Sequence, residues 1–304
     1  MKRLAFLVNH FCWRTARNVI CLIPSGRQRL YPADILAARF GPTDAVYAWG
    51  VFESHATALN EAGFSGATTM LEVGPGRNMG GPLLWWCFIK SLQTGPQIDV
   101  SLTLWDVFPN MKIGHWEGVA SDLLSVSRPH AVFPDVVRIL REVESAHLAP
   151  DIRYFVCTAK ALSGKTKDKF DLILSHAALE HVWDIASVWR LLAQLTRPDG
   201  WHSHWIDLCD HGRRETNYLE MCMWPQWVYW LTMRFIPGAV NRWRAQQHVD
   251  FLRRLKFTIV YRKDSLAERL PVPLDWLAVR FRRMGEHQLK IRRTHIIARN
   301  TPAL

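Results

Sequence analysis

The sequence predicts an α/β protein whose mostly parallel sheet carries helices on both faces. From residue 67 onward, short apolar runs alternate with longer amphipathic segments, which is the pattern of strands joined by helical crossovers. A glycine-rich turn follows the first apolar run, at the position where such folds bind ligands. Two more apolar runs close the chain, and we expect these closing strands to pair antiparallel at the sheet edge.

The individual elements follow from apolar patterning and from stop signals. Five strands are expected in ATTMLEV, IDVSLTLWD, IRYFVC, FDLILS and WHSHWIDL, at residues 67–73, 98–106, 152–157, 170–175 and 201–208. Helices are expected from the glycine turn to Ser91 and over residues 133–147, 179–195 and 241–255. The segment RPDG is a stop signal for the third of these helices. The closing strands are expected over residues 256–263 and 289–300.

One α/β domain with elaborations fits the length of 304 residues, and we expect it to span residues 61–304. Insertions are expected at about 107–131 and 209–241, because an open α/β sheet builds its substrate site from loops at the carboxyl ends of strands. Residues 1–60 are predicted to form a helical extension. Its mixture of apolar, aromatic and basic residues fits a helix on a membrane surface or a helix packed on the protein's own surface.

Charge and cysteine usage narrow the class of partner and the compartment. The net charge is +11, and residues 242–304 hold fifteen Lys and Arg against five acids, which predicts one positively charged face. Anionic lipid headgroups, a phosphorylated substrate or nucleic acid are all suited to such a face. The six cysteines form no C-x-x-C pair and no disulfide-like spacing, so a cytoplasmic location is expected.

The glycine-rich turn TMLEVGPGRNMGG, residues 69–81, is the first feature that indicates chemistry. Gly74 and Gly76 permit backbone conformations and a close approach that a side chain would block. The dinucleotide fingerprint needs a third glycine where this chain has Met79, which weakens the pyrophosphate interpretation. Glu72 indicates a ligand with a positive charge. A purely structural turn is the alternative.

Asp106, at the carboxyl end of the second strand, is the next candidate. A carboxylate at this position can accept hydrogen bonds from both hydroxyls of a ribose. Taken alone, a helix-capping or loop role explains the residue equally well.

Two later segments, KFDLILSHAALEHVWD and LLAQLTRPDGW, resemble motifs of class I S-adenosylmethionine-dependent methyltransferases of the methyltransferase-11 type. Together with LEVGPG and LTLWD, their order and spacing match that family over about residues 67–208. The resemblance implies a Rossmann-like seven-stranded sheet with an antiparallel last strand, and S-adenosyl-L-methionine as the cofactor.

The resemblance also implies roles for the first motifs. Gly74 and Gly76 would face the amino-acid portion of the cofactor, and Glu72 would help to hold its ammonium group. Asp106 would bind the ribose. The chain departs from the family pattern at Asn78, where the last glycine of E-x-G-x-G-x-G usually falls.

The segment CTAKAL would reach the adenine, and Ser175 and His176 would border the site. The acid that often contacts adenine is replaced by Thr158, whose hydroxyl is a weaker hydrogen-bond acceptor than a carboxylate. We therefore expect a weaker adenine contact, or help from the backbone of Ala159.

The segment HSHWIDLCDHG after the fifth strand resembles, more loosely, a segment of bacterial methyltransferases that modify surface polysaccharides and sugars. It predicts a general base, His211 or His176, with Asp207 fixing the histidine tautomer. Asp207, Asp210 and His211 as ligands of a divalent metal, or as a structural cluster, are the alternatives, and we expect no metal. His181 in LEHV is predicted to line the site.

These observations predict an S-adenosylmethionine-dependent methyltransferase that transfers a methyl group to a hydroxyl of a sugar or another small metabolite. The expected partners are a small-molecule or glycan acceptor and an anionic membrane surface. A nucleic-acid methyltransferase that uses the basic C-terminal region is one alternative, although no appended RNA-binding module or N-P-P-Y-like signature is evident. A non-catalytic scaffold with the same fold is the other.

Overall fold

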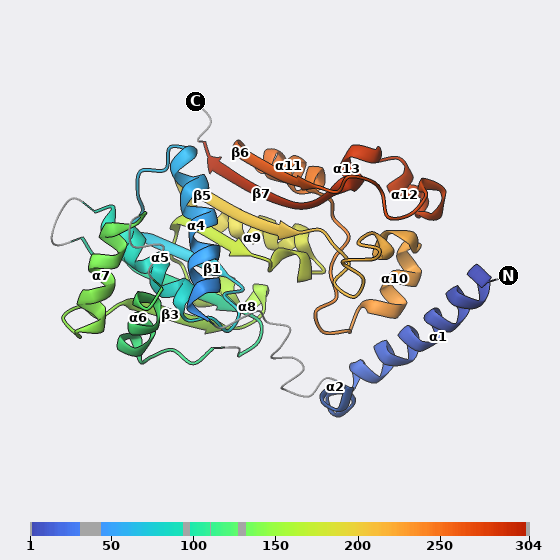
Figure 1. Ribbon diagram of the computed structural model, residues 1–304, viewed down its shortest axis with the longest axis horizontal. Coiled ribbons are helices and arrows are strands. Elements are labelled where there is room, and N and C mark those ends of the chain that lie inside the picture. Colours follow the sequence, from blue (N-terminus) through green and yellow to red (C-terminus); the bar gives the residue numbers. More distant parts are fainter. Residues whose placement is uncertain (1, 31–43, 94–97, 110, 127–131, 302–304) are drawn as a thin grey trace.

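The computed structural model describes residues 2–30, 44–93, 98–109, 111–126 and 132–301 (Figure 1). The predicted N-terminal extension and the insertion expected at 107–131 therefore lie partly outside the described residues.

Seven strands form one sheet in the order β3-β2-β1-β4-β5-β7-β6. The strands are β1 (Thr69–Val73), β2 (Ser101–Asp106), β3 (Asp151–Val156), β4 (Phe170–His176), β5 (Thr196–Asp207), β6 (Phe257–Leu266) and β7 (Ile291–Asn300). Pairs among β1 to β5 are parallel, whereas β7 is antiparallel to both β5 and β6. The predicted α/β class, the parallel sheet and the antiparallel last strand are confirmed.

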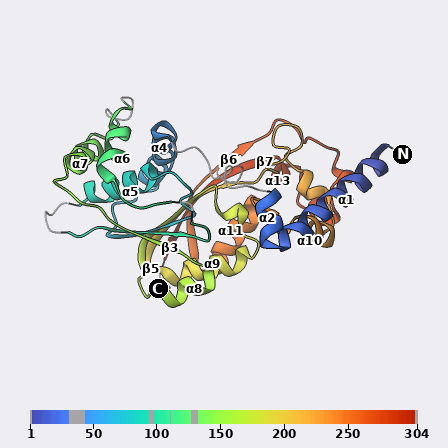
Figure 2. The same cartoon turned by 90° about the horizontal axis from the view of Figure 1, so that it is seen from below.

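Helices cover both faces of this sheet (Figure 2). On one side lie α4 (Ala45–Glu61), α5 (Gly80–Ser91), α6 (Trp116–Leu124) and α7 (Pro134–Glu144). On the other lie α8 (Ala159–Lys165), α9 (Ile185–Leu195) and α11 (Ala245–Arg254). The remaining helices are α1 (Lys2–Leu22), α2 (Pro24–Leu30), α10 (Gln226–Met233), α12 (Val279–Arg282) and α13 (Glu286–Lys290).

The alternation of side chains along β1 shows why both faces need cover. Met70 packs with α4 and α5, whereas Leu71 and Val73 pack in the cluster that contains α8, α9 and α11. Successive side chains of a strand point to opposite faces, so an apolar run such as MLEV requires an apolar layer on each side. A third apolar cluster joins the segment after β5 to the region around α12.

The predicted extension divides into two parts in the structure. α4 is integral to the core, because Trp49 and Phe52 are buried against α5 and α6. α1 instead packs against α10 at the other end of the molecule (Figures 1 and 2). The buried Asn18 donates to the carbonyl oxygen of Leu231 at 2.7 Å and accepts from the amide of Phe235 at 2.6 Å.

The helix expected over 179–195 begins later than predicted. Leu179–His181 is a single 3-10 turn, and α9 starts at Ile185 after Asp184, whose carboxylate accepts from the amide of Ser187. An aspartate placed before an apolar-periodic run is a strong N-cap, and here it determines the boundary. No helix among the described residues is both long and apolar enough to span a bilayer.

Candidate active site

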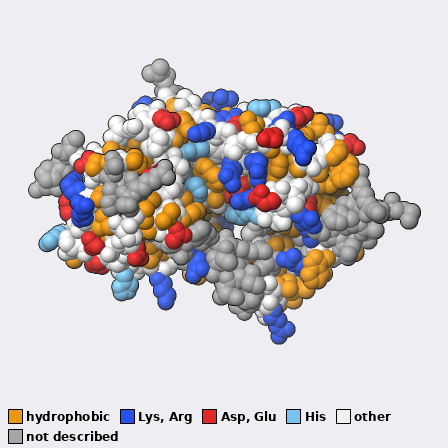
Figure 3. All heavy atoms as spheres, in the orientation of Figure 1, with side chains coloured by type: hydrophobic (Ala, Val, Ile, Leu, Met, Phe, Trp, Pro, Cys, Tyr) orange, Lys and Arg blue, Asp and Glu red, His pale blue; other side chains and the backbone are white. Residues whose placement is uncertain are grey.

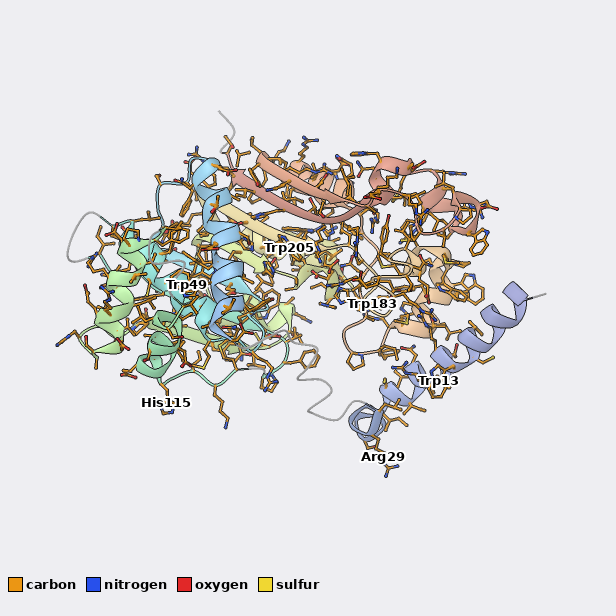
Figure 4. The ribbon with its side chains drawn as sticks, viewed as in Figure 1. Trp13, Arg29, Trp49, His115, Trp183 and Trp205 are labelled. Atoms are coloured by element: carbon orange, nitrogen blue, oxygen red, sulfur yellow. The ribbon has the colours of Figure 1, made fainter. Side chains whose placement is uncertain are left out.

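A cavity of about 1000 Å³ opens where the parallel strands end. Its wall is built by the carboxyl ends of β1, β2, β4 and β5, by α1, and by the segment from α10 to residue 240. Predicted site residues that line this cavity are Gly74, Gly76, Asp106, His176, Asp207 and His211. Two of the tryptophans labelled in Figure 4, Trp205 and Trp183, also line it. The fold therefore brings residues from across the sequence to one site.

The glycine loop forms the part of the cavity wall next to β1. Gly74 has φ +66°, and a Cβ atom there would lie 2.6 Å from the Cβ of Ala178. Gly76 has φ +70°, which is also in the left-handed region. Only glycine adopts these angles without strain, so both residues are fixed by the turn itself. The loop leaves room for a ligand to approach the backbone closely.

Glu72 does not line the cavity but lies buried beside it, with 5% of its surface exposed. Its Oε2 has no hydrogen-bond partner among the described residues, and burial raises its pKa to about 8. The carboxyl is close enough to Tyr47, a lining residue, to help raise the pKa of that phenol, after the larger effects of burial and of Glu180. A buried carboxyl oxygen without a partner is costly, and a ligand ammonium group would satisfy it.

Asp106 ends β2 and is 8% exposed. Its Oδ1 accepts from the backbone amides of Val107 at 2.6 Å and Phe108 at 3.1 Å. These bonds hold the carboxylate at the cavity wall, in the place expected for an acid that binds ribose hydroxyls. Val107 and Phe108 also line the cavity, and the sequence pattern gave no signal for them.

Asn78, which departs from the family pattern, has a local structural role. Its Oδ1 accepts from the amides of Gly80 at 2.8 Å and Gly81 at 3.4 Å, at the start of α5. Its Nδ2 donates to the carbonyl oxygen of Asp44, directly before α4. The side chain thus caps one helix and attaches the loop to another.

The expected adenine contacts lie away from the cavity wall. The Thr158 hydroxyl caps α8 by accepting from the amide of Ala161, and neither Thr158 nor Ala159 lines the cavity. Ser175 is fully buried and its hydroxyl is 2.8 Å from Nδ1 of His204. Ser175 therefore belongs to the core next to the site, and the adenine role of Thr158 and Ala159 stays a prediction.

His176, the last residue of β4, faces the cavity and is fixed on two sides. Its ring stacks on Trp205 with a centroid distance of 4.5 Å, and its Nδ1 lies 3.2 Å from Nε2 of His55. His55 continues to the hydroxyl of Ser203 at 2.7 Å, which in turn meets Nε2 of His295 at 3.0 Å. Burial, with smaller effects of His295 and Arg293, lowers the pKa of His176 to about 4. The imidazole is therefore neutral at pH 7.

Asp207 is the last residue of β5, and His211 follows that strand; both line the cavity. Nε2 of His211 is 3.6 Å from Oδ2 of Asp207, which is longer than a hydrogen bond. Asp207 is more closely paired with Arg214. Burial acts to raise the pKa of Asp207, but His211, the Cys209 amide and Arg214 outweigh it and bring that pKa to about 2. Asp207 is thus an ionised carboxylate.

Five arginines line the cavity and make it cationic: Arg14, Arg17, Arg214, Arg234 and Arg293. Arg14 pairs with Glu220 at 2.6 Å. Within the described part of the chain, Arg234 and Arg293 have no acidic partner; they lie over the rings of Trp183 and Trp205, at 5.3 and 5.4 Å from the ring centroids. The sequence predicted a basic C-terminal region, but only the fold brings these side chains to one cavity.

The seven-stranded sheet, with the order β3-β2-β1-β4-β5-β7-β6 and an antiparallel hairpin at its end, has the topology of the α/β methyltransferase fold. A family model described as "Methyltransferase domain" matches residues 123–203. The chain is an S-adenosylmethionine-dependent methyltransferase, and its acceptor is not determined. No curated protein shows significant similarity to the chain.

Solved structures with a similar fold include methyltransferases. A protein of Galdieria sulphuraria assigned as a sarcosine dimethylglycine methyltransferase is 13% identical, with a TM-score of 0.45, over 83% of this chain and 86% of that one. The N-methyltransferase NodS of Bradyrhizobium japonicum in complex with S-adenosyl-L-homocysteine is 14% identical, with a TM-score of 0.40, over 82% and 87% of the two chains.

Proposed function

We propose that this chain methylates a hydroxyl group of a small acceptor, such as a sugar, that carries an anionic group, and that it does so at the surface of an anionic membrane. The observation that carries the reaction type is the neutral His176 at the end of β4, in the same cavity as the glycine loop.

The residues around the glycine loop fit S-adenosylmethionine. Glu72 supplies the counter-charge for the ammonium group, and its unpartnered oxygen is what supports this role. Gly74 and Gly76 admit the amino-acid portion, and Asp106 accepts from the ribose hydroxyls. When bound, this cofactor supplies an electrophilic methyl group on a sulfonium.

His176 is suited to act as the general base. With Nδ1 held by His55, the other ring nitrogen, Nε2, has no hydrogen-bond partner among the described residues. A hydroxyl, unlike an amine, must lose its proton as it attacks, so a neutral imidazole in the cavity favours a hydroxyl acceptor. Stacking on Trp205 fixes the ring, and such positioning supplies much of the rate acceleration.

His211 is the second candidate for the base. Asp207, its proposed orienting partner, lies 3.6 Å away and is engaged by Arg214. The more closely held His176 is therefore the base that we favour, with Asp207 as a fixed negative charge in the same cavity.

Arg234 and Arg293 support an acceptor with a phosphate or carboxylate group. Both guanidinium groups are held only by aromatic rings, so their donors are directed to no protein carboxylate in the described structure. Arginine binds such anions through paired donors. Arg293 lies over the same indole on which His176 stacks, which would place the anionic group of the acceptor near the base.

The membrane part of the proposal rests on α1. Between residues 11 and 23, every exposed side chain is apolar: Cys12, Trp13, Ala16, Val19, Ile20, Leu22 and Ile23. We call this the outer face of α1. The opposite face carries Arg14, Arg17 and Asn18 toward the cavity and α10. A helix that exposes its apolar face needs a partner.

Figure 3 shows hydrophobic side chains on the described part of α1 next to basic ones. Trp13 is 60% exposed and Arg29, on α2, is exposed as well (Figure 4). Apolar insertion combined with basic residues and a net charge of +11 matches an anionic bilayer surface. Because α1 also walls the cavity, the acceptor would then be reached close to the membrane.

Methyl transfer tests the reaction. Methyl-labelled S-adenosylmethionine is incubated with sugars, sugar phosphates and matched amino sugars, and we expect methyl ethers of the anionic hydroxyl acceptors. His176→Asn should lower kcat by about 10²–10⁴ with KM for the cofactor unchanged. The control His287→Asn changes an exposed histidine on α13. Products methylated only on nitrogen would contradict the proposal.

Sedimentation with vesicles tests the membrane contact. Vesicles with phosphatidylglycerol should bind the protein more strongly than neutral ones, and Trp13→Ser with Ile20→Ser should abolish the difference. Val260→Ser, which changes an apolar residue of β6 that is 39% exposed, is the matched control. Equal partition to both kinds of vesicle would refute the contact.

A further inference from the structure

Two side chains to which the proposed reaction assigns no role meet His211, the less favoured candidate base, at the cavity wall. Glu180 and His181 belong to the 3-10 turn Leu179–His181, and His211 follows β5. One potential ligand atom of each lies within 4.8 Å of the other two. The two imidazole rings are 5.0 Å apart and nearly perpendicular, at 72°. Such a cluster is the arrangement expected of groups that share one ligand.

Glu180 is the unusual member of the cluster. It is 2% exposed, and neither of its carboxylate oxygens has a hydrogen-bond partner among the described residues. Burial raises the pKa of Glu180 well above its usual range, and the nearby amides of Glu180 and Asp207 offset this only in part. A buried carboxyl without a partner is costly to keep. A cation between it and the two histidines would satisfy both of its oxygens.

The neighbouring carboxylates differ from Glu180 in this respect. Asp207 is paired with Arg214, and Oδ1 of Asp210 accepts from the amide of Gly212 at 2.9 Å. The sequence suggested Asp207, Asp210 and His211 as an alternative metal set. The structure instead brings His211 together with Glu180 and His181. These two residues stand in the segment LEHV, which the sequence predicted to be the start of a helix.

The donor types indicate which cations fit. Calcium and magnesium prefer oxygen ligands in sets of six or more. Two imidazole nitrogens and one carboxylate match first-row transition metals, and catalytic zinc sites use three such ligands with an open fourth position. His181 and His211 line the cavity, so the open positions of a bound cation would face the acceptor.

We propose that Glu180, His181 and His211 bind one divalent transition-metal ion, such as Mn²⁺ or Zn²⁺, at the cavity wall. Asp207, with Oδ2 3.6 Å from Nε2 of His211, adds negative charge beside the ion. The ion would hold an oxygen of the acceptor and lower the pKa of a bound hydroxyl. This second role depends on the proposed function, whereas metal binding itself does not.

Binding to the full-length protein tests the site. After removal of metal with a chelator, titration with MnCl₂ and ZnCl₂ should show one equivalent bound per chain, and MgCl₂ should bind much more weakly. The spectrum of Mn²⁺ by electron paramagnetic resonance should change on binding. Glu180→Gln and His211→Ala should each weaken Mn²⁺ binding by at least about 10–100-fold. The His211 side chain is 30% exposed, so this variant is expected to fold.

Two control variants make the result specific. His176→Asn, in the same cavity but outside the cluster, and His287→Ala, on the surface, should bind Mn²⁺ as the parent does. Absence of stoichiometric binding, or binding that is unchanged in both Glu180→Gln and His211→Ala, would overturn the proposal. Titration with S-adenosylhomocysteine tests the proposed cofactor site separately from the metal site, because the cofactor site uses residues other than Glu180, His181 and His211.

Discussion

At the scale of single residues, Gly74 shows how far a motif can be interpreted. The sequence predicted that this glycine allows close approach to a ligand. The structure adds that Gly74 has φ +66° and that Ala178, from the loop after β4, lies where a Cβ atom would be. The position of Ala178 explains why even a methyl group is excluded at residue 74, and no local sequence pattern reveals this contact.

Gly74→Ala is expected to lower the free energy of unfolding by about 1–3 kcal/mol, because the backbone is strained and the new methyl group meets Ala178. It should also weaken binding of S-adenosylhomocysteine. Urea unfolding and calorimetry measure the two effects. Gly118→Ala, in α6 with no atom within 4 Å of the added Cβ, should leave both unchanged or raise stability slightly. Equal behaviour of the two variants would show that Gly74 is not constrained.

The histidines mark the limit of residue-level prediction. His176 was identified because it directly follows the predicted strand FDLILS, and the site was expected at the carboxyl ends of the strands. His55 and His295 stand alone in the segments SHAT and THII, and neither has a spacing that indicates a role. They reach His176 only because α4 and β7 pack near β4 and β5. Contacts between such distant segments are properties of the fold rather than of any motif.

At the scale of elements, α1 combines the two alternatives that its sequence left open. Its polar face packs on the protein, through Asn18 against α10 and through Arg14 to Glu220 at 2.6 Å. Its outer face remains exposed. The amphipathic pattern of α1 is evident in the sequence, but the pattern does not tell which face packs on the protein. Apolar residues usually face a core, and here they do not. The inverted orientation follows from the cavity and α10, which offer polar partners to α1.

Asn18→Ala should loosen α1 from α10. The change removes a donor to Leu231 and an acceptor for the Phe235 amide, and it leaves both backbone groups without a partner, at a cost of about 1–3 kcal/mol. Hydrogen exchange should become faster in α1 and α10 and stay the same in α5. Cys12→Ser, on the outer face, is the control. Unchanged exchange in α1 would mean that these bonds do not hold the helix.

At the scale of the whole molecule, the fold was largely predictable because apolar runs, turns and stop signals encode it locally. The strand set and the antiparallel β7 are as expected. The cavity was not predictable in the same way. It is closed by α1 and by residues 234–240, which lie more than 200 residues apart in the sequence and carry no shared motif. The start of α9 was misplaced because the N-cap Asp184 was taken as part of the helix.

Burial lowers the pKa values of seven histidines, of which five lie in the core and His176 and His181 lie at the cavity wall: His55, His176, His181, His202, His204, His248 and His295. In the unfolded chain these histidines bind protons as the pH falls below about 6.5, whereas in the folded chain they bind protons only at a lower pH. Stability is therefore present above pH 6.5 and is lost as the pH falls toward about 4. The buried carboxyls Glu72, Glu180 and Asp210, whose pKa values are raised, oppose this effect but are fewer.

Urea unfolding at several pH values measures this acid sensitivity. One pKa unit corresponds to about 1.4 kcal/mol, so lowered pKa values at several histidines are large beside a typical unfolding free energy of about 5–15 kcal/mol. We expect the midpoint urea concentration to fall steeply between pH 6.5 and pH 5. A midpoint that is the same at both values would show that the histidines are not buried as described.

The most direct test of the central claim is calorimetric titration of the purified protein with S-adenosylhomocysteine. One molecule should bind per chain, and Asp106→Ala should weaken binding strongly, because Asp106 is fixed by the amides of Val107 and Phe108 at the cavity wall. Gly118→Ala should bind as the parent does. Absence of binding at millimolar ligand, or an affinity unchanged by Asp106→Ala, would contradict the assignment of this cavity as the cofactor site.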